Sequence, residues 1–264
     1  MILLTPLDLS LAALLIVLLA FLCMHMKLEL SRQILVAGLR TTIQLLIIGY
    51  VLKALFSEVH PAWMGLIAII MLTAAAREVT ARQKRRFTGW RGFGIGGVSM
   101  FVSSFSITIL ALTVIIKARP WYAPQYAVPL LGMLLGNTMS GIALGLDRLT
   151  QSAWEQRTVI EGRLMMGQTW QDAIGHIVRD STKSGMIPIL NAMSAAGLVS
   201  LPGMMTGQIL AGSPPIEAVK YQILIMFLIT GGTGFGTLLA VRLGAAGLFD
   251  ERERLCMKRL SMKN

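Results

Sequence analysis

The stretch Gly197–Ile223, GLVSLPGMMTGQILAGSPPIEAVKYQI, breaks a long apolar run that covers residues 186–211. Pro202 and Gly203 lie inside that run. A proline removes a backbone donor and clashes with the preceding turn, so a helix here must kink or stop, and the freed carbonyls need new partners. We therefore interpret Pro202-Gly203 as a hinge or gate, and the soft and polar side chains beside it as part of a pathway. Those side chains are Met204, Met205 and Gln208.

The composition of the chain is that of an integral membrane protein. Hydrophobic residues make up 55% of the 264 residues, charged residues 14%, and the mean hydropathy is +0.67, which excludes an ordinary soluble domain. The net charge of +11 would suit nucleic acid, but the basic residues cluster in short loops between apolar runs, as membrane topology requires. Cys23 and Cys256 have no metal-site or disulfide spacing. We expect no nucleic-acid partner.

Seven apolar windows are long enough to cross a bilayer, since a spanning helix needs about 20 residues. We predict an all-α, polytopic fold with one transmembrane domain over residues 1–264. Lys and Arg concentrate in alternate loops, and the positive-inside rule then places the N-terminus outside and the C-terminus in the cytoplasm. The predicted spans are 7–25, 33–53, 61–77, 95–116, 125–146, 186–211 and 218–241.

The basic loop Arg77–Arg91 is predicted to anchor the topology beside anionic lipid headgroups. The glycine run Gly89–Gly97 follows no predicted strand and lacks the Lys-Ser/Thr of a nucleotide loop. Glycines spaced closely at the start of a span favour tight helix packing instead.

The cytoplasmic segment 147–185 is too long for a simple connection. Ser152–Glu155 has the pattern of a capping box that starts a helix ending near Gly167, and Thr169–Asp172 can cap a second helix. The pair covers about 152–181. Its amphipathic pattern leaves two alternatives open, a helical pair lying on the membrane surface or a docking element for a cytoplasmic partner.

The predicted spans hold few groups that do chemistry. Asp8, Glu58, Asp147 and Glu217 all lie at span boundaries, and a proton-coupled carrier usually needs a titratable group within its spans. No Ser-His-Asp, paired-carboxylate or metal-hydrolase pattern occurs in any loop. We therefore expect a protein that is not an enzyme.

Arg40 and Gln44 share one face of the second span, and Asn137 lies in the fifth. Arg40 is close enough to a span end to snorkel to the interface, and amides in membranes often join helices. These residues are therefore candidates for a pathway or for packing. The spacing of four glycines in the fifth span favours close helix contact: Gly132, Gly136, Gly141 and Gly145.

The segment Gly197–Gly212, followed by Pro215 and Ala218–Ile223, resembles the Fet-type permeases, the membrane subunits of a small ABC transporter linked to bacterial iron export, which are similar to plant aluminium-tolerance permeases. The resemblance covers nearly the whole chain. Supporting segments occur in the same order: Arg40–Leu46, Gly49–Lys53, Leu131–Asn137 and Arg179–Ser181.

This resemblance implies that the helical pair couples the chain to a separate ATP-binding cassette subunit. No Walker sequence GxxxxGK[ST] occurs in this chain, so ATP and Mg would be bound by that partner, and we expect no cofactor on this chain. Glu161, Gly167 and Ile177 echo the spacing of the coupling loop in other ABC permeases. The Leu-Pro ending of that loop is replaced here by Arg179-Asp180. The predicted coupling residues are Glu161, Arg163, Gly167, Thr169, Trp170, Arg179 and Asp180.

The resemblance further implies a homodimer in the bacterial inner membrane that exports iron or another metal by alternating access. The expected substrate pathway consists of Arg40, Gln44, Asn137, Met204, Met205 and Gln208. The residues themselves specify no metal site, because ferrous iron ordinarily prefers carboxylate or imidazole ligands. Two other classes of function stay open: a secondary carrier without an ATPase, and a membrane scaffold that transports nothing.

Overall fold

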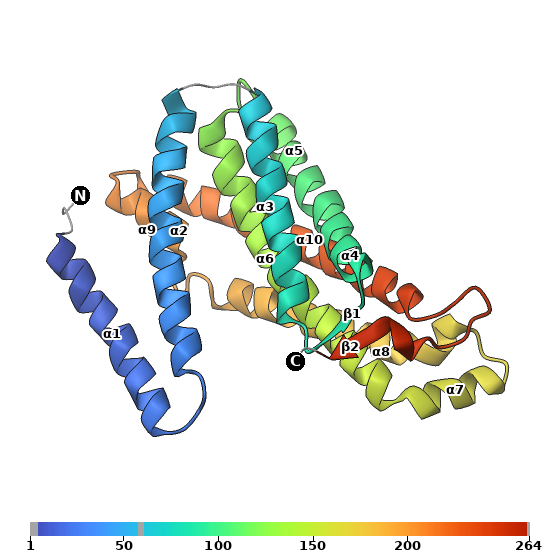
Figure 1. Ribbon diagram of the computed structural model, residues 1–264. Coiled ribbons are helices and arrows are strands. Elements are labelled where there is room, and N and C mark those ends of the chain that lie inside the picture. The colour runs from blue at the N-terminus through green and yellow to red at the C-terminus, as the bar shows by residue number, and fades with distance from the viewer. Residues whose placement is uncertain (1–4, 58–60, 263–264) are drawn as a thin grey trace. The chain divides into compact units, whose positions relative to one another are not determined.

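The computed structural model describes residues 5–57 and 61–262 and divides the chain into two compact units, Met1–Val59 and His60–Asn264 (Figure 1). Glu58, one of the boundary carboxylates considered above, lies outside the described residues. The single transmembrane domain expected over residues 1–264 stays a prediction.

The N-terminal unit is a hairpin of two helices, α1 (Pro6–His25) and α2 (Ser31–Ser57). A capping box starts α1: the backbone N–H of Thr5 donates to Asp8 Oδ2 at 2.8 Å, and the backbone N–H of Asp8 donates to Thr5 Oγ1 at 3.4 Å. The two helices pack closely where Gly38 faces Ile16, since a methyl group at Gly38 would lie 3.3 Å from Ile16 Cγ2.

The larger unit is a bundle of helices with one small sheet. The fourth apolar segment of the chain, Trp90–Ile115, lies in this unit, and it contains two π-helical turns, η1 and η2. The elements are α3 (Pro61–Arg82), β1 (Arg85–Phe87), α4 (Trp90–Met100), η1 (Phe101–Phe105), α5 (Ser106–Leu110), η2 (Ala111–Ile115), α6 (Pro124–Glu155), α7 (Arg157–Met165), α8 (Trp170–Ala195), α9 (Gly203–Leu210), α10 (Pro215–Gly247), η3 (Met257–Arg259) and β2 (Leu260–Met262).

Six helices among the described residues are long and apolar enough to cross a membrane. They match six of the seven predicted windows: Leu7–His25, Ser31–Lys53, Pro61–Arg82, Trp90–Ile115, Pro124–Glu155 and Pro215–Gly247.

The remaining window, 186–211, forms no single helix, in agreement with the predicted break. α8 ends at Ala195, a non-helical segment follows, and α9 begins at Gly203 with Pro202 as its N-cap. Gly197 adopts a φ of +84°, a left-handed conformation that ends the helix several residues before the proline. The break was predicted, but it is a loop between two helices and not a kink inside one.

The glycine-rich start of the fourth apolar segment packs on α3, as predicted. A methyl group at Gly96 would lie 3.2 Å from Val79 Cγ1, and one at Gly92 would lie 3.1 Å from Thr80 Cγ2. The absence of side chains at these two positions therefore allows α3 and α4 to approach closely.

α6 and α10 run in the same direction through their contact. Along the two helices, Gly232 faces Leu134, Gly236 faces Thr138, and Gly244 faces Leu146. Residue numbers increase in the same direction along both helices. The chain must therefore return from the C-terminal end of α6 to the opposite end of the bundle before α10 begins.

α8 supplies this return, because it packs on both helices in the opposite direction. A methyl group at Gly185 would lie 2.5 Å from the Gly141 carbonyl oxygen and 2.6 Å from Thr237 Cγ2. Further along α8, the Thr230 hydroxyl of α10 lies 2.8 Å from the Met193 sulfur. The predicted packing role of Gly141 is thus confirmed, while Gly136 has open space around it.

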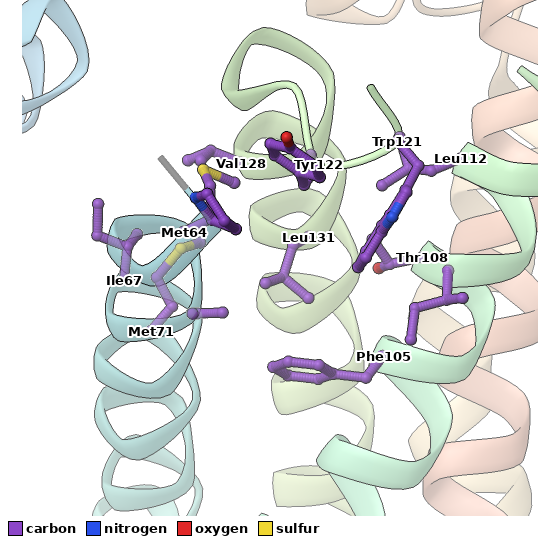
Figure 2. Close-up of a pocket in the computed structure, with 15 residues that line it drawn as sticks. Met64, Ile67, Met71, Phe105, Thr108, Leu112, Trp121, Tyr122, Val128 and Leu131 are labelled. Atoms are coloured by element: carbon purple, nitrogen blue, oxygen red, sulfur yellow. The ribbon is translucent and has the colours of Figure 1, made fainter. Parts of the chain in front are cut away.

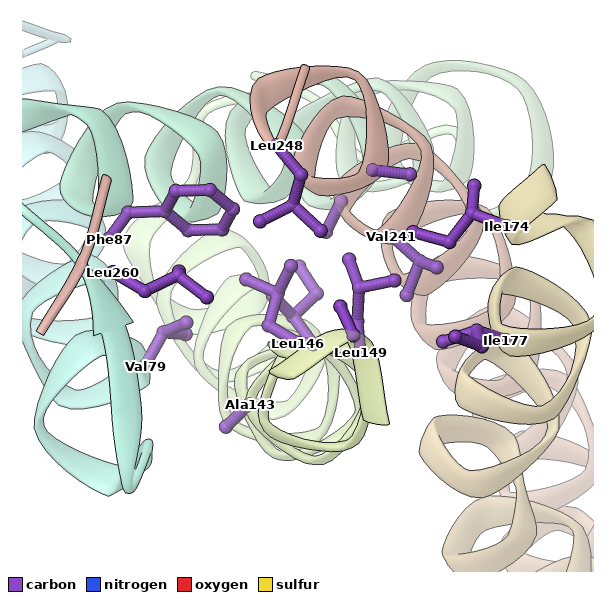
Figure 3. Packing of buried hydrophobic residues seen from close by; sticks show 14 of the residues in the cluster. Val79, Phe87, Ala143, Leu146, Leu149, Ile174, Ile177, Val241, Leu248 and Leu260 are labelled. Atoms are coloured by element: carbon purple, nitrogen blue, oxygen red, sulfur yellow. The ribbon is translucent and has the colours of Figure 1, made fainter. Parts of the chain in front are cut away.

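A buried apolar core lies where α3, α6, α8, α10 and the small sheet meet (Figure 3). Leu146, Leu149 and Ile174 are completely buried in it. Phe87 of β1 reaches α10, since methyl groups at Gly247 and Gly244 would lie 3.5 and 3.8 Å from its ring. This core fixes the shared end of the three long helices.

The described residues are all-α apart from two short strands, β1 and β2. These strands pair antiparallel, so the basic loop is tied to the C-terminal tail. Arg259 Nη1 donates to the carbonyl oxygens of Gly247 and Phe249, at 2.9 and 2.6 Å, and so caps the end of α10. The tail and the basic loop therefore lie at the same end of the bundle.

The predicted boundaries of the helical pair 152–181 need a correction. α6 continues through Ser152, which is buried, and ends at Glu155, so Ser152 caps no helix. The first helix of the pair is α7. The second begins as predicted, because the Thr169 side chain accepts a hydrogen bond from the backbone N–H of Asp172.

Candidate functional site

Two of the predicted pathway residues, Arg40 and Gln44, belong to the N-terminal unit. Both are exposed, and they lie one turn apart on α2. The other four belong to the larger unit.

Asn137 lies on an exposed face of α6. Its Nδ2 donates to the Met133 carbonyl oxygen at 2.8 Å, a bond within its own helix. The next residue, Thr138, is completely buried and faces Gly236 of α10. Of the two neighbouring polar residues, Thr138 therefore places its hydroxyl in the contact between α6 and α10, and the Asn137 amide stays outside it.

α9 carries the remaining predicted pathway residues. Met205 is buried, and Met204 packs on a second apolar cluster that includes Leu130, Ile189 and Ile225. Gln208 has a buried Oε1 without a hydrogen-bond partner among the described residues. A buried amide oxygen without a partner is unfavourable, so Gln208 is the one predicted pathway residue with an unsatisfied group.

The junction between α7 and α8 holds most of the predicted coupling residues. Arg163 Nη1 donates to the Ala173 carbonyl oxygen at 3.0 Å and lies 3.1 Å from His176 Nδ1, and His176 Nε2 lies 2.8 Å from Gln156 Oε1. These contacts connect α7 to α8 and connect α8 to Gln156, the residue between α6 and α7. The junction is therefore a fixed hairpin, with Gly167 at its turn in the left-handed conformation, φ +84°.

The C-terminal segment after α10 also holds this hairpin. The Trp170 ring stacks on Phe249 at a centroid distance of 5.5 Å, and the Trp170 backbone N–H donates to Glu253 Oε2 at 3.2 Å. No prediction was made for this C-terminal segment. Its pairing is non-local, so no spacing along the chain indicated it.

The tip of the hairpin presents an exposed surface. Met165 is 85% exposed and Met166 74%. Glu161 and Gly167 line an open groove of about 610 Å³ beside them, together with residues 252–255 of the C-terminal segment. Arg179 and Asp180 are exposed further along α8. The hairpin tip thus combines large apolar side chains with charges of both signs.

The environment of His176 disfavours its protonated form. Partial burial lowers the pKa of His176 from its ordinary value of 6.5, and the positive charges of Arg163 and Arg179 lower it further, while Asp180 opposes them. The neutral ring can accept a hydrogen bond from Arg163. The hairpin therefore favours a neutral histidine.

An apolar cavity of about 230 Å³ lies between α3, the fourth apolar segment and α6 (Figure 2). Phe105, Leu131 and Met71 point into it, Trp121 and Tyr122 lie at one end, and Thr108 contributes a hydroxyl. None of the predicted pathway residues lines this cavity.

Across the described ranges 5–57 and 61–262, no three His, Cys, Asp or Glu side chains come together as a metal site would require. The sequence-based choice of polar and sulfur-bearing pathway residues stays a prediction.

Comparisons with known proteins agree with the fold. A model of an uncharacterised protein family, UPF0014, matches residues 6–249. The UPF0014 membrane protein slr1647 of Synechocystis is 39% identical over 232 residues, covering 86% of this chain and 87% of the relative. The probable iron export permease protein FetB of Escherichia coli is 32% identical over 257 residues, 95% of each chain. The UPF0014 membrane protein STAR2 of rice is 34% identical, covering 82% of this chain and 74% of the relative.

No solved structure matches the chain. The relatives confirm the resemblance to Fet-type permeases, and their names are those of membrane proteins and permeases, which suggests transport rather than catalysis. Together with the six apolar helices, they identify a multi-pass membrane protein. The chain belongs to the UPF0014 family of membrane proteins.

Proposed function

We propose that this chain is the permease subunit of an ABC transporter of the bacterial inner membrane, working as a homodimer with two separate ATPase subunits. ATP and Mg are bound by those subunits. The observation that carries the proposal is the α7–α8 hairpin, which is fixed to the bundle at its base and exposed at its tip.

The tip is suited to docking a protein partner. Exposed methionines adapt to irregular apolar surfaces, and Met165 and Met166 stand beside a groove with Glu161, Arg252 and Arg254 on its walls. An apolar centre with a charged rim is the usual composition of a protein interface. A partner with an apolar pocket and charges on its edge fits this tip.

A push on the tip reaches the interior of the bundle through α8. The helix begins at Trp170, which is held by Phe249, and it packs at Gly185 against α6 and α10. Because close-packed interiors transmit displacement, movement of the hairpin shifts α8 relative to both helices. The loop 196–202 at the far end then acts as the hinge, with Pro202-Gly203 at its junction with α9.

Iron or another metal is the substrate we propose, in the export direction. The support is the name of the E. coli relative, a probable iron export permease protein. Coupling to ATP is supported by the hairpin geometry, which a carrier driven by an ion gradient does not need.

The test is reconstitution of the purified chain in proteoliposomes, with and without a P-loop ATPase encoded by a neighbouring gene. We expect the two proteins to co-purify and to move Fe²⁺ only when both are present with ATP. Movement of Fe²⁺ on an ion gradient alone would favour a secondary carrier. Co-purification without transport of any of several metals would favour a scaffold.

A further inference from the structure

The fourth apolar segment carries a row of hydroxyls on its buried side, which we name the hydroxyl row. It consists of Ser99, Ser103, Ser104 and Thr108, whose exposed fractions are 0, 5, 0 and 6%. The central π-helical turn, η1, contains Ser103 and Ser104. Both of these consecutive residues are buried, and π-helical turns inside helices are frequent at functional sites.

The hydroxyl row faces the contact between α6 and α10. Ser104 Oγ donates to Thr138 Oγ1 of α6 at 3.4 Å. Ser103 Oγ approaches α10 at Gly236, where a methyl group would lie 2.8 Å from it, and Thr138 Oγ1 would lie 3.5 Å from a methyl group at Gly232. Three helical segments thus meet along a strip of hydroxyls and bare glycine backbone.

Several hydroxyls around this contact are buried without a partner. Ser99 Oγ, at one end of the row, has none among the described residues. Thr233 Oγ1 and Thr237 Oγ1 of α10 also have none, and these two side chains lie beside Gly141, on the side of the contact that faces α8. All three side chains are at most 2% exposed. A hydroxyl inside a membrane protein ordinarily finds a partner in its own helix or a neighbour. Buried hydroxyls without a partner therefore mark a place where a species that binds to hydroxyl oxygens can enter.

The apolar cavity gives the fourth apolar segment room to move. Thr108 lies at one end of the hydroxyl row and also lines the cavity, together with Phe105 and Leu112 of the same segment (Figure 2). The side of the segment that faces α10 is closely packed, whereas the side that faces α3 borders about 230 Å³ of empty space. A shift toward α3 would close the cavity and separate Ser103 from Gly236.

We propose that the substrate crosses the bundle along the hydroxyl row, opened by movement of the fourth apolar segment into the cavity. The proposal rests on the proposed transport function and gives it a route. Hydroxyl and carbonyl oxygens are ligands for hard cations, so the route fits a cation that exchanges hydration water for protein oxygens. The route passes Thr138, and it leaves Asn137 on the outer face of α6.

The test measures access to the row by cysteine labelling. Ser104→Cys is made in a chain with Cys23→Ser and Cys256→Ser, reconstituted with its ATPase, and exposed to a small cationic methanethiosulfonate reagent. The matched control is Val102→Cys, on the same π-helical turn but 48% exposed. We expect Ser104→Cys to react at least tenfold faster in one nucleotide state than in the other, and Fe²⁺ to slow the reaction. Val102→Cys should show neither effect.

A second comparison separates a route from simple packing. Thr138→Val keeps the shape of the buried side chain and removes its hydroxyl, while Thr113→Val does the same on an exposed part of the fourth apolar segment. We expect Fe²⁺ transport to fall at least tenfold in Thr138→Val and to stay unchanged in Thr113→Val, with both proteins folded.

Two results would overturn the route. The first is a Ser104→Cys complex that transports Fe²⁺ while its cysteine stays unreactive in every nucleotide state. The second is full Fe²⁺ transport by Thr138→Val. Neither result affects the proposed function, which fails if the unaltered chain and its ATPase move no metal, or if the unaltered chain moves Fe²⁺ without the ATPase.

Discussion

The two ends of α8 differ sharply in how they are held. At the hairpin end, Ala173 and Ile174 are completely buried, and Arg163 and His176 connect α8 to α7. At the other end, the loop 196–202 exposes Leu198 at 90% and Val199 at 85%. One end is part of the core and the other is a loosely packed connection.

This difference suggests how a helix can act as a lever. Local stability depends on buried contacts, so segments with few of them open first. We expect a force applied at the fixed hairpin to be carried along α8 and the conformational change to occur at the end with few buried contacts. The predictions below test the fixed end, the middle contact and the loose end in turn.

The largest effect is expected from Ile174→Ala. The side chain is completely buried in the core, and truncating a buried isoleucine destabilises by about 2–5 kcal/mol. Ile187→Ala, on the same helix but 51% exposed, should change stability much less. Thermal unfolding in detergent compares the two variants, and equal melting temperatures would show that the hairpin end is not fixed as described.

Gly185→Ala should cause the second-largest loss of stability. The new methyl group would lie 2.5 Å from the Gly141 carbonyl oxygen, and backbone cannot yield as a side chain can, so overpacking should cost about 1–3 kcal/mol. Gly175→Ala is the control on the same helix, because nothing lies within 4 Å of its new methyl group. It should stabilise by up to about 1 kcal/mol through helix propensity. Chemical denaturation measures both, and the same sign for both would argue against the three-helix contact.

At the loose end, Gly197→Ala should destabilise by about 1–2 kcal/mol, since the residue has a φ of +84° that a side chain disfavours. Pro202→Ala should change stability less, because Pro202 is only an N-cap without a side-chain hydrogen bond. It should nevertheless slow ATP-coupled transport while membrane insertion stays intact. Unchanged transport in Pro202→Ala would count against the hinge.

The smallest effect is a pH dependence from His176. Its folded-state pKa lies below the ordinary value of 6.5, so the unfolded chain binds the proton more readily. The stability contribution is complete above pH 6.5 and is lost as the pH falls through the lowered pKa. His176→Gln should flatten this part of the stability profile, measured as melting temperature against pH. A profile that keeps its slope would assign the dependence to another group.

Much of the helical framework could be predicted from the sequence. Apolar windows of spanning length are strong signals, and six of them correspond to helices. The Thr169 cap was readable because a capping residue acts locally. Ser152 has the same local pattern, but the helix continues through it because Ala153 is buried in the core. At Ser152, tertiary packing determines that the helix continues, and a local sequence pattern cannot show this.

The candidate site was less predictable, because helix rotation decides which polar group faces inward. Asn137 was chosen for its amide, yet Thr138 shares a helix face with Gly141 and Gly145, the glycines that pack against neighbouring helices. That shared face was a usable signal in the sequence. The pairing of Arg85–Phe87 with Leu260–Met262 had no such signal, since it joins segments far apart in the chain.

The measurement that tests the central claim most directly is ATP-driven Fe²⁺ transport by the reconstituted complex with an altered hairpin tip. Met166 is 74% exposed, so Met166→Asp should leave the fold intact while placing a charge in the proposed interface. The account predicts that the unaltered chain transports Fe²⁺ only with its ATPase and ATP, and that Met166→Asp abolishes both ATPase binding and transport. Full transport by Met166→Asp, or transport without any ATPase, would contradict it.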